Sequence, residues 1–420
     1  MSDASFYFDD RETRSDAERR EEQGSRLPGL IAHAKEASAF YAKHLEGVEA
    51  KAVTDLEALA ALPVTRKHDL IALQKEQPPF GGLAALDATQ ARRVFTSPGP
   101  IYELEADEPD YWRTARAFHA AGFRPGQLIH NCFSYHLTPG GWIMDAGARA
   151  LGCAVFPGGV GNSEQQAQAM AQFRPEGYAG TPDFLKVILE KADELSLDVS
   201  SVKHALVSGG ALFPQLRDAY AERGVTTLQC YATADCGLIA YESLSREGEL
   251  CPGMLVEEEV ILEILRPGTG DPVPDGEVGE VVVSVFSKAA PLVRFATGDL
   301  SAVLEGESPC GRTGRRIKGW MGRADQTAKV KGMFVHPEQI DTVLKRHPEV
   351  AKARLEVTRA GDQDAMTLKA EAEAADGLAE ALGGSLAEVC KLKGRVEIVA
   401  PGSLPNDGKV IDDQRDYSGG

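Results

Sequence analysis

Short apolar runs alternate with segments of helical periodicity through the middle of the chain. The apolar runs, which predict strands, lie at residues 127–132, 153–159, 177–181, 204–210 and 226–232. Between them, segments such as 142–152, 163–173 and 182–195 place apolar residues three and four positions apart, as amphipathic helices do. Parallel strands joined by covering helices produce this rhythm. The pattern predicts an α/β fold with a parallel sheet covered on both faces.

The periodicity changes after Cys251. Residues 254–286 alternate apolar and polar side chains around Pro-Gly turns, which predicts an antiparallel β-hairpin. The block after Arg323 carries strand and helix patterns in the order of a small α+β domain. We therefore predict a large N-terminal domain of parallel and mixed sheets with a β-hairpin region, residues 1–323, and a small C-terminal α+β domain, residues 324–420.

Helical patterns also precede the predicted sheet. Residues 25–45 and 111–121 carry apolar side chains at helical spacing, and the second of these segments ends at a Gly- and Pro-containing stop. Residues 61–73 predict a turn followed by a helix that Thr65 caps.

Composition and charge narrow the classes of partner. The chain has 420 residues, enough for two or three domains, with the apolar and charged content of a globular protein. Its formal net charge of −18 argues against non-specific binding to nucleic acid or to an anionic membrane. No apolar run approaches the roughly 18 residues of a membrane-spanning helix, and the polar, acidic N-terminus lacks the pattern of a secretory signal. These features predict a cytoplasmic protein.

The seven cysteines do not predict a disulfide framework, because their number is odd and no Cys-x-x-Cys motif occurs. Cys236, Cys251 and Cys310 are candidates for a metal site if the fold brings them together. The favoured interpretation is that the cysteines are free thiols that act as small apolar residues, with Cys153 and Cys230 buried beside strands.

The stretch 291–337 contains an ordered set of motifs. It reads PLVRFATGDL, then GRRIKGWMGRADQ, then KVKGMFVHPEQID. This order, together with the early segments 26–45 and 56–70, resembles the phenylacetate–coenzyme A ligase family of adenylate-forming enzymes. The resemblance extends from about residue 25 to 410. It implies a large N-terminal nucleotide- and acyl-binding domain and a small C-terminal domain that moves between two half-reactions.

The resemblance implies an AMP-forming ligase that uses ATP, Mg²⁺ and CoA. A carboxylic acid, aryl or aryl-acetic, would be converted to an acyl-adenylate and then to a CoA thioester. Relatives of this kind suggest a homodimer that binds neither nucleic acid nor membrane. Two alternatives stay open at this point: an adenylation enzyme that loads a carrier protein, and a homologue deficient in ATP turnover that acts as a binding protein.

The adenine site is expected at two strand ends. A strand that ends in Ser208, Gly209 and Gly210 lets the backbone approach a flat ring closely, because the glycines have no Cβ atom. In the family this turn stacks on adenine, and the aromatic residue at Tyr231, followed by Ala232, packs near it.

The resemblance also assigns a phosphate and metal position. Thr233 would lie beside the phosphates, and Asp235 stands where relatives usually carry the Glu that holds Mg²⁺ near the α-phosphate. A carboxylate oxygen is a hard ligand that suits Mg²⁺, so Asp235 is also a candidate catalytic residue. The alternative interpretation is a plain β-to-α turn in which the aspartate caps a helix.

The motifs in residues 291–337 contain the residues expected at the ribose site and at the hinge. In the family the acid at Asp299 accepts hydrogen bonds from both ribose hydroxyls, for which a carboxylate has two acceptor oxygens. Arg323 would approach the ribose or the phosphates, and Asp325 would absorb the backbone change of the hinge, helped by Gly322. Arg294 suits a structural or a phosphate-side role.

Three residues of the small domain match family positions. Lys409 corresponds to the lysine that enters the site for adenylation, where a cation offsets charge that builds in the transition state. The alternative is a solvated lysine near the chain end. Lys331 and Gly332 stand where the family presents a turn to CoA.

The phosphate loop departs from the family. Relatives carry a Gly-, Ser- and Thr-rich loop that ends in Gly-Lys, and this chain has TSPGP at residues 96–100 instead. Ser97 and Gly99 retain some loop character, so backbone N–H groups there remain candidates for ATP binding. Pro98 and Pro100 remove two donors. The sequence therefore predicts a degenerate phosphate loop.

The acyl pocket is expected along residues 131–141, the segment that lines it in the family. Tyr135, His136 and Gly140 are the candidate residues. An aromatic wall suits a planar aryl acid. The alternative is that the tyrosine and the histidine are core residues below the sheet.

Overall fold

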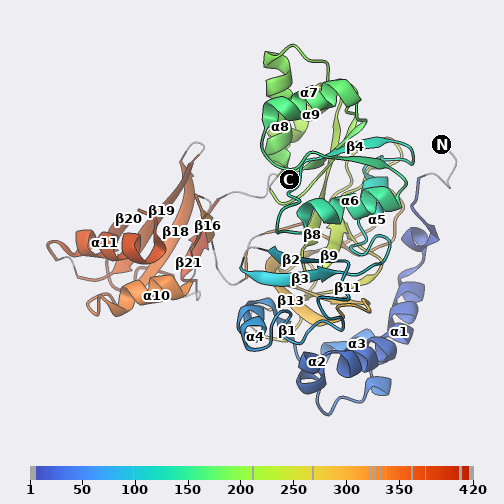
Figure 1. Ribbon diagram of the computed structural model, residues 1–420. Helices are drawn as coiled ribbons and strands as arrows, with labels where there is room; N and C mark the ends of the chain where they lie inside the picture. The colour runs from blue at the N-terminus through green and yellow to red at the C-terminus, as the bar shows by residue number, and fades with distance from the viewer. Residues whose placement is uncertain are drawn as a thin grey trace. The chain divides into compact units, whose positions relative to one another are not determined.

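The chain folds into two compact units. The computed structural model describes residues 6–97, 99–210, 212–266, 269–321, 323–324, 328–331, 333–335, 337–360, 363–373, 375–405 and 409–415. The first unit comprises the residues up to 297 together with 301–320, and the second comprises 298–300 together with 321–418 (Figure 1). None of the helices in these described ranges combines the length and the apolar content that a membrane-spanning helix needs.

The first unit begins with a helical segment. Its elements are the 3₁₀ helices η2 Asp10–Thr13, η3 Ala50–Ala52 and η4 Lys67–Asp69, and the α-helices α1 Asp16–Ala37, α2 Ala39–His44, α3 Leu56–Ala60 and α4 Leu70–Glu76. The predicted start at residue 25 was wrong, because a capping box formed by Ser15 and Glu18 starts α1 nine residues earlier than that. Its first turns carry charged residues, so apolar periodicity did not reveal them.

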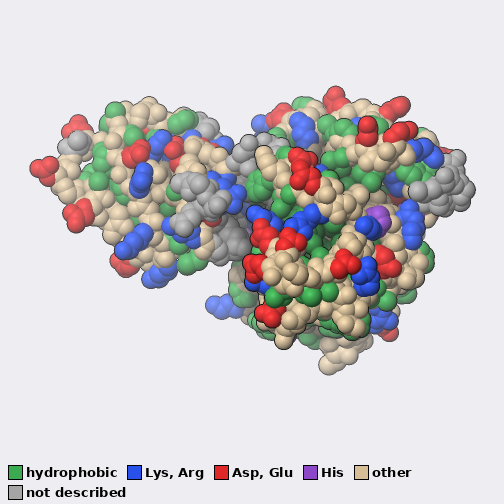
Figure 2. Space-filling model, turned by 90° about the horizontal axis from the view of Figure 1, so that it is seen from above, with side chains coloured by type: hydrophobic (Ala, Val, Ile, Leu, Met, Phe, Trp, Pro, Cys, Tyr) green, Lys and Arg blue, Asp and Glu red, His purple; other side chains and the backbone are tan. Residues whose placement is uncertain are grey.

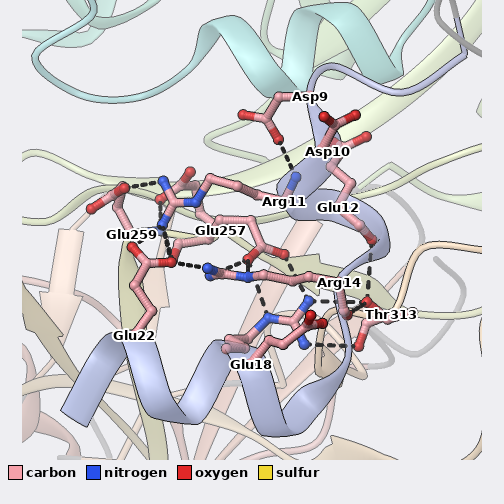
Figure 3. A network of polar contacts seen from close by, with 12 residues as sticks. Asp9, Asp10, Arg11, Glu12, Arg14, Glu18, Glu22, Glu257, Glu259 and Thr313 are labelled. Atoms are coloured by element: carbon pink, nitrogen blue, oxygen red, sulfur yellow. Dashed lines mark hydrogen bonds and ion pairs between the residues drawn. The ribbon is translucent and has the colours of Figure 1, made fainter. Parts of the chain in front are cut away.

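Ion pairs tie this N-terminal segment to the body of the first unit. Arg19 contacts Glu258 at 3.1 Å, and both side chains are buried. Figure 3 shows that Arg11 and Arg14, which precede α1, reach both Glu22 of α1 and acidic residues of the 257–259 turn. These mutually paired charges, of which Arg19 and Glu258 are buried, tie down a segment that has few apolar residues.

The largest sheet has nine strands. In spatial order they are β14 Val303–Leu304, β15 Arg316–Ile317, β10 Met254–Val256, β9 Gly237–Tyr241, β8 Thr226–Thr233, β7 His204–Val207, β6 Gly177–Gly180, β4 Leu128–Asn131 and β5 Ala154–Pro157. Strands β4 to β8 are parallel, and the others add antiparallel pairs beyond β8. The prediction of a parallel sheet is confirmed for its central part.

Helices cover both faces of this sheet. They are α5 Ala115–Ala120, α6 Gly140–Ala150, α7 Ser163–Phe173, α8 Pro182–Glu194 and α9 Pro214–Glu222. Successive side chains of a strand point to opposite faces. Accordingly, Ala205 and Val207 of β7 pack with residues of α7, α8 and α9, whereas Leu206 packs with residues of α5 and α6 (Figure 1).

A four-stranded sheet completes the first unit. Its spatial order is β1 Thr65–Arg66, β13 Leu292–Ser301, β12 Gly279–Val285 and β11 Val260–Leu265, and β2 Arg93–Ser97 pairs separately with β3 Ile101–Glu105. The antiparallel pair β11–β12 confirms the predicted hairpin. The predicted helix cap at Thr65 was wrong, because this residue pairs with Phe295 of β13 and its hydroxyl donates to the carbonyl of Val293 at 3.0 Å.

The second unit is a small α+β domain, as predicted. Its elements are β16 Ala328–Val330, β17 Met333–Val335, α10 Pro337–Lys345, β18 Lys352–Ala360, β19 Gln363–Glu371, α11 Leu378–Cys390, β20 Arg395–Val399 and β21 Ile411–Asp413. Strand β21 was not predicted, because it is short. It pairs in parallel with β18, and Ile411 joins the apolar core of the domain.

Charged side chains of both signs lie on the face of the molecule drawn in Figure 2. Figure 2 shows acidic and basic side chains interspersed on the face that it presents, in spite of the net charge of −18. All seven cysteines are free and buried, which confirms the favoured interpretation of these residues. Within the described ranges, no group of three or more His, Cys, Asp and Glu residues is arranged to hold a metal ion.

Candidate active site

The turn after β7 has the open geometry expected of a ring-binding surface. Ser208 is buried and its hydroxyl donates to the carbonyl of Cys230 at 2.8 Å, which joins the turn to β8. Gly209 and Gly210 are exposed, and Gly209 has φ +71°, a conformation that L-residues rarely adopt. The amide of Gln229 donates to the Gly210 carbonyl at 3.2 Å. These contacts hold a side-chain-free surface at a strand end.

The segment 231–235 forms the end of a β-hairpin. Strand β8 turns directly into the antiparallel strand β9, so the alternative of a β-to-α turn with a helix-capping Asp235 is wrong. Tyr231 is buried, and its hydroxyl lies 3.4 Å from that of Thr297. Ala232 and Thr233 are half-buried, and the Thr233 hydroxyl accepts the backbone N–H of Cys236 at 3.1 Å. The tight turn therefore presents Asp235 at its tip.

Asp235 forms an ion pair that sequence reasoning missed. Its Oδ2 lies 2.5 Å from Nζ of Lys67, and only 6% of the Asp235 side chain is exposed. Lys67 belongs to η4, directly after β1, and the pairing of β1 with β13 fixes its position. The sequence feature that could have indicated this ion pair is a basic residue directly after a short strand. Strand β1 itself was not predicted, so the feature was not recognised.

The degenerate phosphate loop is a β-hairpin, and it contains a second missed acid. Ser97 ends β2 and donates to Oε1 of Glu103 on β3 at 2.5 Å. Gly99 lies exposed in the connection. Burial, and then the charge of Asp235, raise the pKa of Glu103 to about 8. The alternation of residues 101–105 could have indicated that this carboxylate faces inward.

Asp299 and Arg323 meet within the second unit. Their side chains are 3.1 Å apart, and an isolated antiparallel bridge joins their backbones. Asp299 is buried, and Gly298 before it has φ +77°. A Cβ atom at Gly298 would lie 2.7 Å from Nη2 of Arg323, so glycine is needed there for the close approach. Asp325, the expected hinge residue, and Gly322 lie outside the described residues.

The candidate lysines of the second unit have different environments. Lys409 is 54% exposed and its Nζ lies 3.1 Å from Asp412. Lys331 has φ +49°, and its backbone N–H donates to Oδ2 of Asp364 at 3.0 Å. Gly332 lies outside the described residues.

The candidate acyl-pocket residues surround the start of α6. Tyr135 is half-buried; its hydroxyl accepts from Nδ2 of Asn131 at 2.8 Å and donates to Asp145 at 3.3 Å. Its ring meets that of Trp142 edge to face, with centroids 5.0 Å apart. Burial raises the pKa of Tyr135. His136 is exposed, so it is not a core residue, and the half-buried Gly140 begins α6.

Comparison with known proteins places these features in a family. Residues 117–286 match the model of the AMP-binding enzyme family, and residues 332–415 match that of the AMP-binding enzyme C-terminal domain. The chain is 32% identical to phenylacetate-coenzyme A ligase of Thermus thermophilus over 365 residues, which cover 83% of this chain and 80% of that protein. The chain belongs to the phenylacetate–coenzyme A ligase family.

Two further relatives support this assignment. Phenylacetate-coenzyme A ligase of Escherichia coli K12 is 30% identical over 83% of this chain and 81% of its own length. The crystal structure of 2-hydroxyisobutyryl-CoA ligase in complex with 2-HIB-AMP and CoA aligns with a TM-score of 0.75 and 26% identity, and the alignment covers 99% of this chain and 94% of that one. The similarity to this ligase therefore extends over both units.

Family membership confirms the predicted class of enzyme. This protein is an AMP-forming acid–thiol ligase of the adenylate-forming fold, which converts a carboxylic acid to an acyl-adenylate with ATP and then to a CoA thioester. The turn at 208–210, the hairpin tip at Asp235 and the β2–β3 hairpin all belong to the first unit, where Ser208 contacts β8 and Ile101 of β3 packs in one cluster with Tyr231 and Cys236. Asp299, Arg323, Lys331 and Lys409 belong to the second unit.

Proposed function

We propose that this ligase activates an aryl or aryl-acetic acid with Mg·ATP and transfers the acyl group to free CoA. The choice of acid rests on an aromatic pair: Tyr135, in the segment 131–141 expected to line the acyl pocket, and Trp142, the residue directly after that segment. Ring edges and faces pack well against a planar substrate, and the Tyr135 hydroxyl is held by Asn131 and Asp145 rather than left free to rotate. The relatives named phenylacetate-coenzyme A ligase support the same class of acid.

The proposed nucleotide site uses the residues at the strand ends. The surface formed by Ser208, Gly209 and Gly210 stacks on adenine with Tyr231 and Ala232 beside it. This role is supported by the exposure of the two glycines and by the burial of the Tyr231 ring, which makes a fixed wall. Ser97 and Gly99 of the β2–β3 hairpin are the remaining candidates for contacts to the phosphates.

The residues at the hairpin tip fit a magnesium ion. Asp235 offers a carboxylate and Thr233 a hydroxyl, and such hard oxygen donors are the ligands that Mg²⁺ prefers. When bound, the ion offsets negative charge on the phosphates. When no ion is bound, the ammonium group of Lys67 pairs with the Asp235 carboxylate.

The second unit supplies the ribose and acceptor contacts in this proposal. Asp299 accepts from the ribose hydroxyls while Arg323 orients its carboxylate. Lys409 provides the positive charge that stabilises the transition state of adenylation, Asp325 is the hinge, and Lys331 with Gly332 forms the CoA turn. The exposure of the Lys409 side chain is consistent with a residue that exchanges partners.

The experiment is a panel of aryl, aryl-acetic, fatty and small hydroxy acids with ATP, Mg²⁺ and CoA, in which AMP release is followed. We expect an aryl or aryl-acetic acid to give the highest kcat/KM. A preference for a short hydroxy acid would refute the choice of acid. A parallel reaction with a pantetheinylated carrier protein in place of CoA tests the acceptor, and faster transfer to the carrier would refute free CoA. The homodimer and the cytoplasmic location remain predictions.

A further inference from the structure

The β2–β3 hairpin directs one acidic side chain towards the tip of the β8–β9 hairpin. Ile101 and Glu103 lie on the same face of β3, because alternate residues of a strand share a face. Ile101 packs in the same apolar cluster as Tyr231 and Cys236. Cys236 directly follows Asp235, so the inward face of β3 lies against the segment that carries the candidate magnesium ligand.

Glu103 is an incompletely satisfied buried acid. Its side chain is 8% exposed, and one carboxylate oxygen accepts from Ser97. The other oxygen, Oε2, is buried and has no hydrogen-bond partner among the described residues. Leaving a buried carboxylate oxygen without a partner costs free energy, so such a group calls for a ligand that the protein alone does not provide.

The neighbouring acid on the same strand shows the contrast. Glu105 is also buried, but its oxygens lie 2.7 Å from Arg93 and 3.9 Å from Arg92. Glu105 is therefore a structural ion-pair partner. Glu103 has the hydroxyl of Ser97 as its donor in place of an arginine, and its face of β3 lies against the β8–β9 hairpin that carries Asp235.

We propose that Glu103 provides a second carboxylate ligand, beside Asp235, for the divalent cation that accompanies ATP. The inference rests on the proposed assignment of Asp235 to magnesium. Two carboxylates from two different hairpins present hard oxygens to one ion, and the ion supplies the partner that Oε2 of Glu103 lacks. The chain thereby anchors the cation through its own side chains at the place where its phosphate loop has lost the Gly-Lys ending.

The test is a titration of the full-length protein with Mn²⁺ alone, in which free Mn²⁺ is followed by electron paramagnetic resonance without nucleotide. We expect saturable binding to the wild type. Glu103→Gln and Asp235→Asn should each weaken the affinity about tenfold or more, because even the loss of an outer-shell partner of a metal ligand costs roughly tenfold to a hundredfold. Glu105→Gln is the matched control on the same strand and should bind like the wild type. Thermal unfolding of each variant verifies that it is folded.

Two results would overturn the inference: no saturable Mn²⁺ binding by the wild type at millimolar concentration, or wild-type affinity in folded Glu103→Gln. If Glu103→Gln does not fold, Glu103→Asp keeps the charge on a shorter side chain, and unchanged affinity in that variant would also count against the inference. Adenylate formation is measured separately. Saturable Mn²⁺ binding that Glu103→Gln weakens, in a wild-type protein that makes no adenylate, would leave the metal site standing and remove the proposed function.

Discussion

The carboxylate of Asp299 lies 3.1 Å from the guanidinium of Arg323, and a backbone bridge joins the same two residues. A charge-assisted contact supported by main-chain pairing fixes the direction of the carboxylate oxygens. Gly298 makes this approach possible, because any Cβ atom at that position would meet the guanidinium at 2.7 Å. In the proposed ribose site, this pair would be a pre-oriented acceptor for a vicinal diol.

Substitution of Asp299 tests this role. We expect Asp299→Asn to raise the Kd for AMP tenfold or more, because one acceptor oxygen becomes a donor and the ion pair with Arg323 is lost. The measurement is isothermal titration with AMP. Asp198→Asn removes an exposed ion pair with Arg174 and should leave the Kd unchanged. An unchanged Kd in Asp299→Asn would exclude this carboxylate from the ribose site.

Lys409 is expected to act in the first half-reaction only. Lys409→Ala should lower the rate of pyrophosphate release at least a hundredfold, because a positive charge that stabilises the transition state is lost. The unfolding free energy should change by less than about 1 kcal/mol, since the Lys409 side chain in this ion pair is 54% exposed.

The control for this prediction is Lys186→Ala, which removes another exposed lysine, paired with Glu190. Its rate should equal that of the wild type. Thioester formation from a synthetic acyl-adenylate separates the two half-reactions. A Lys409→Ala protein that releases pyrophosphate at the normal rate would assign this residue to the solvated alternative.

Arg294 is predicted to be structural rather than phosphate-binding. It is fully buried with φ +45°, and it contacts both oxygens of Glu263, at 3.0 and 2.9 Å, and the carbonyls of Leu62 and Gly270. Lysine cannot reproduce this bidentate geometry, so Arg294→Lys should lower the unfolding free energy by about 3 kcal/mol.

Urea unfolding measures this loss, and the exposed Arg266→Lys serves as the control. Under conditions in which Arg294→Lys is folded, its KM for ATP should stay near that of the wild type. Normal stability combined with a raised KM would support the phosphate-side role instead.

His119 should make the first unit sensitive to acid. Burial, followed by the charges of Arg124, Arg312 and Arg116, lowers the pKa of His119 to about 4 from 6.5. Between these two values the unfolded state binds more protons than the folded state, so stability falls as the pH falls from about 6.5 to 4.

His119→Phe removes this titration and keeps an aromatic ring beside Phe8, whose centroid lies 5.7 Å from that of the histidine. When the pH falls from 6.5 to 4, the unfolding free energy of the variant should decrease by roughly 1–2 kcal/mol less than that of the wild type, after allowance for solvent screening. Thermal unfolding across this range, with the exposed His136→Phe as control, provides the measurement. Parallel pH profiles for the two variants would contradict the prediction.

Periodicity predicted the central sheet well, because its strands are short apolar runs separated by amphipathic helices, as at 177–181 and 182–195. It failed where other forces position the backbone. The start of α1 depends on a capping box and on ion pairs, and β1 exists only because β13 lies beside it. A two-residue strand has no period of its own to detect.

The sequence by itself determined the α/β class, the order of the elements and the family motifs at Asp235, Asp299 and Lys409. These features depend on residue type and on spacing over a few positions, which are local properties of the sequence. Tertiary structure decided which charges meet. The pairing of Asp235 with Lys67 and the approach of Glu103 join residues that are far apart in sequence. Electrostatic interaction and burial depend on distance in space, and only the packing of the hairpins sets that distance.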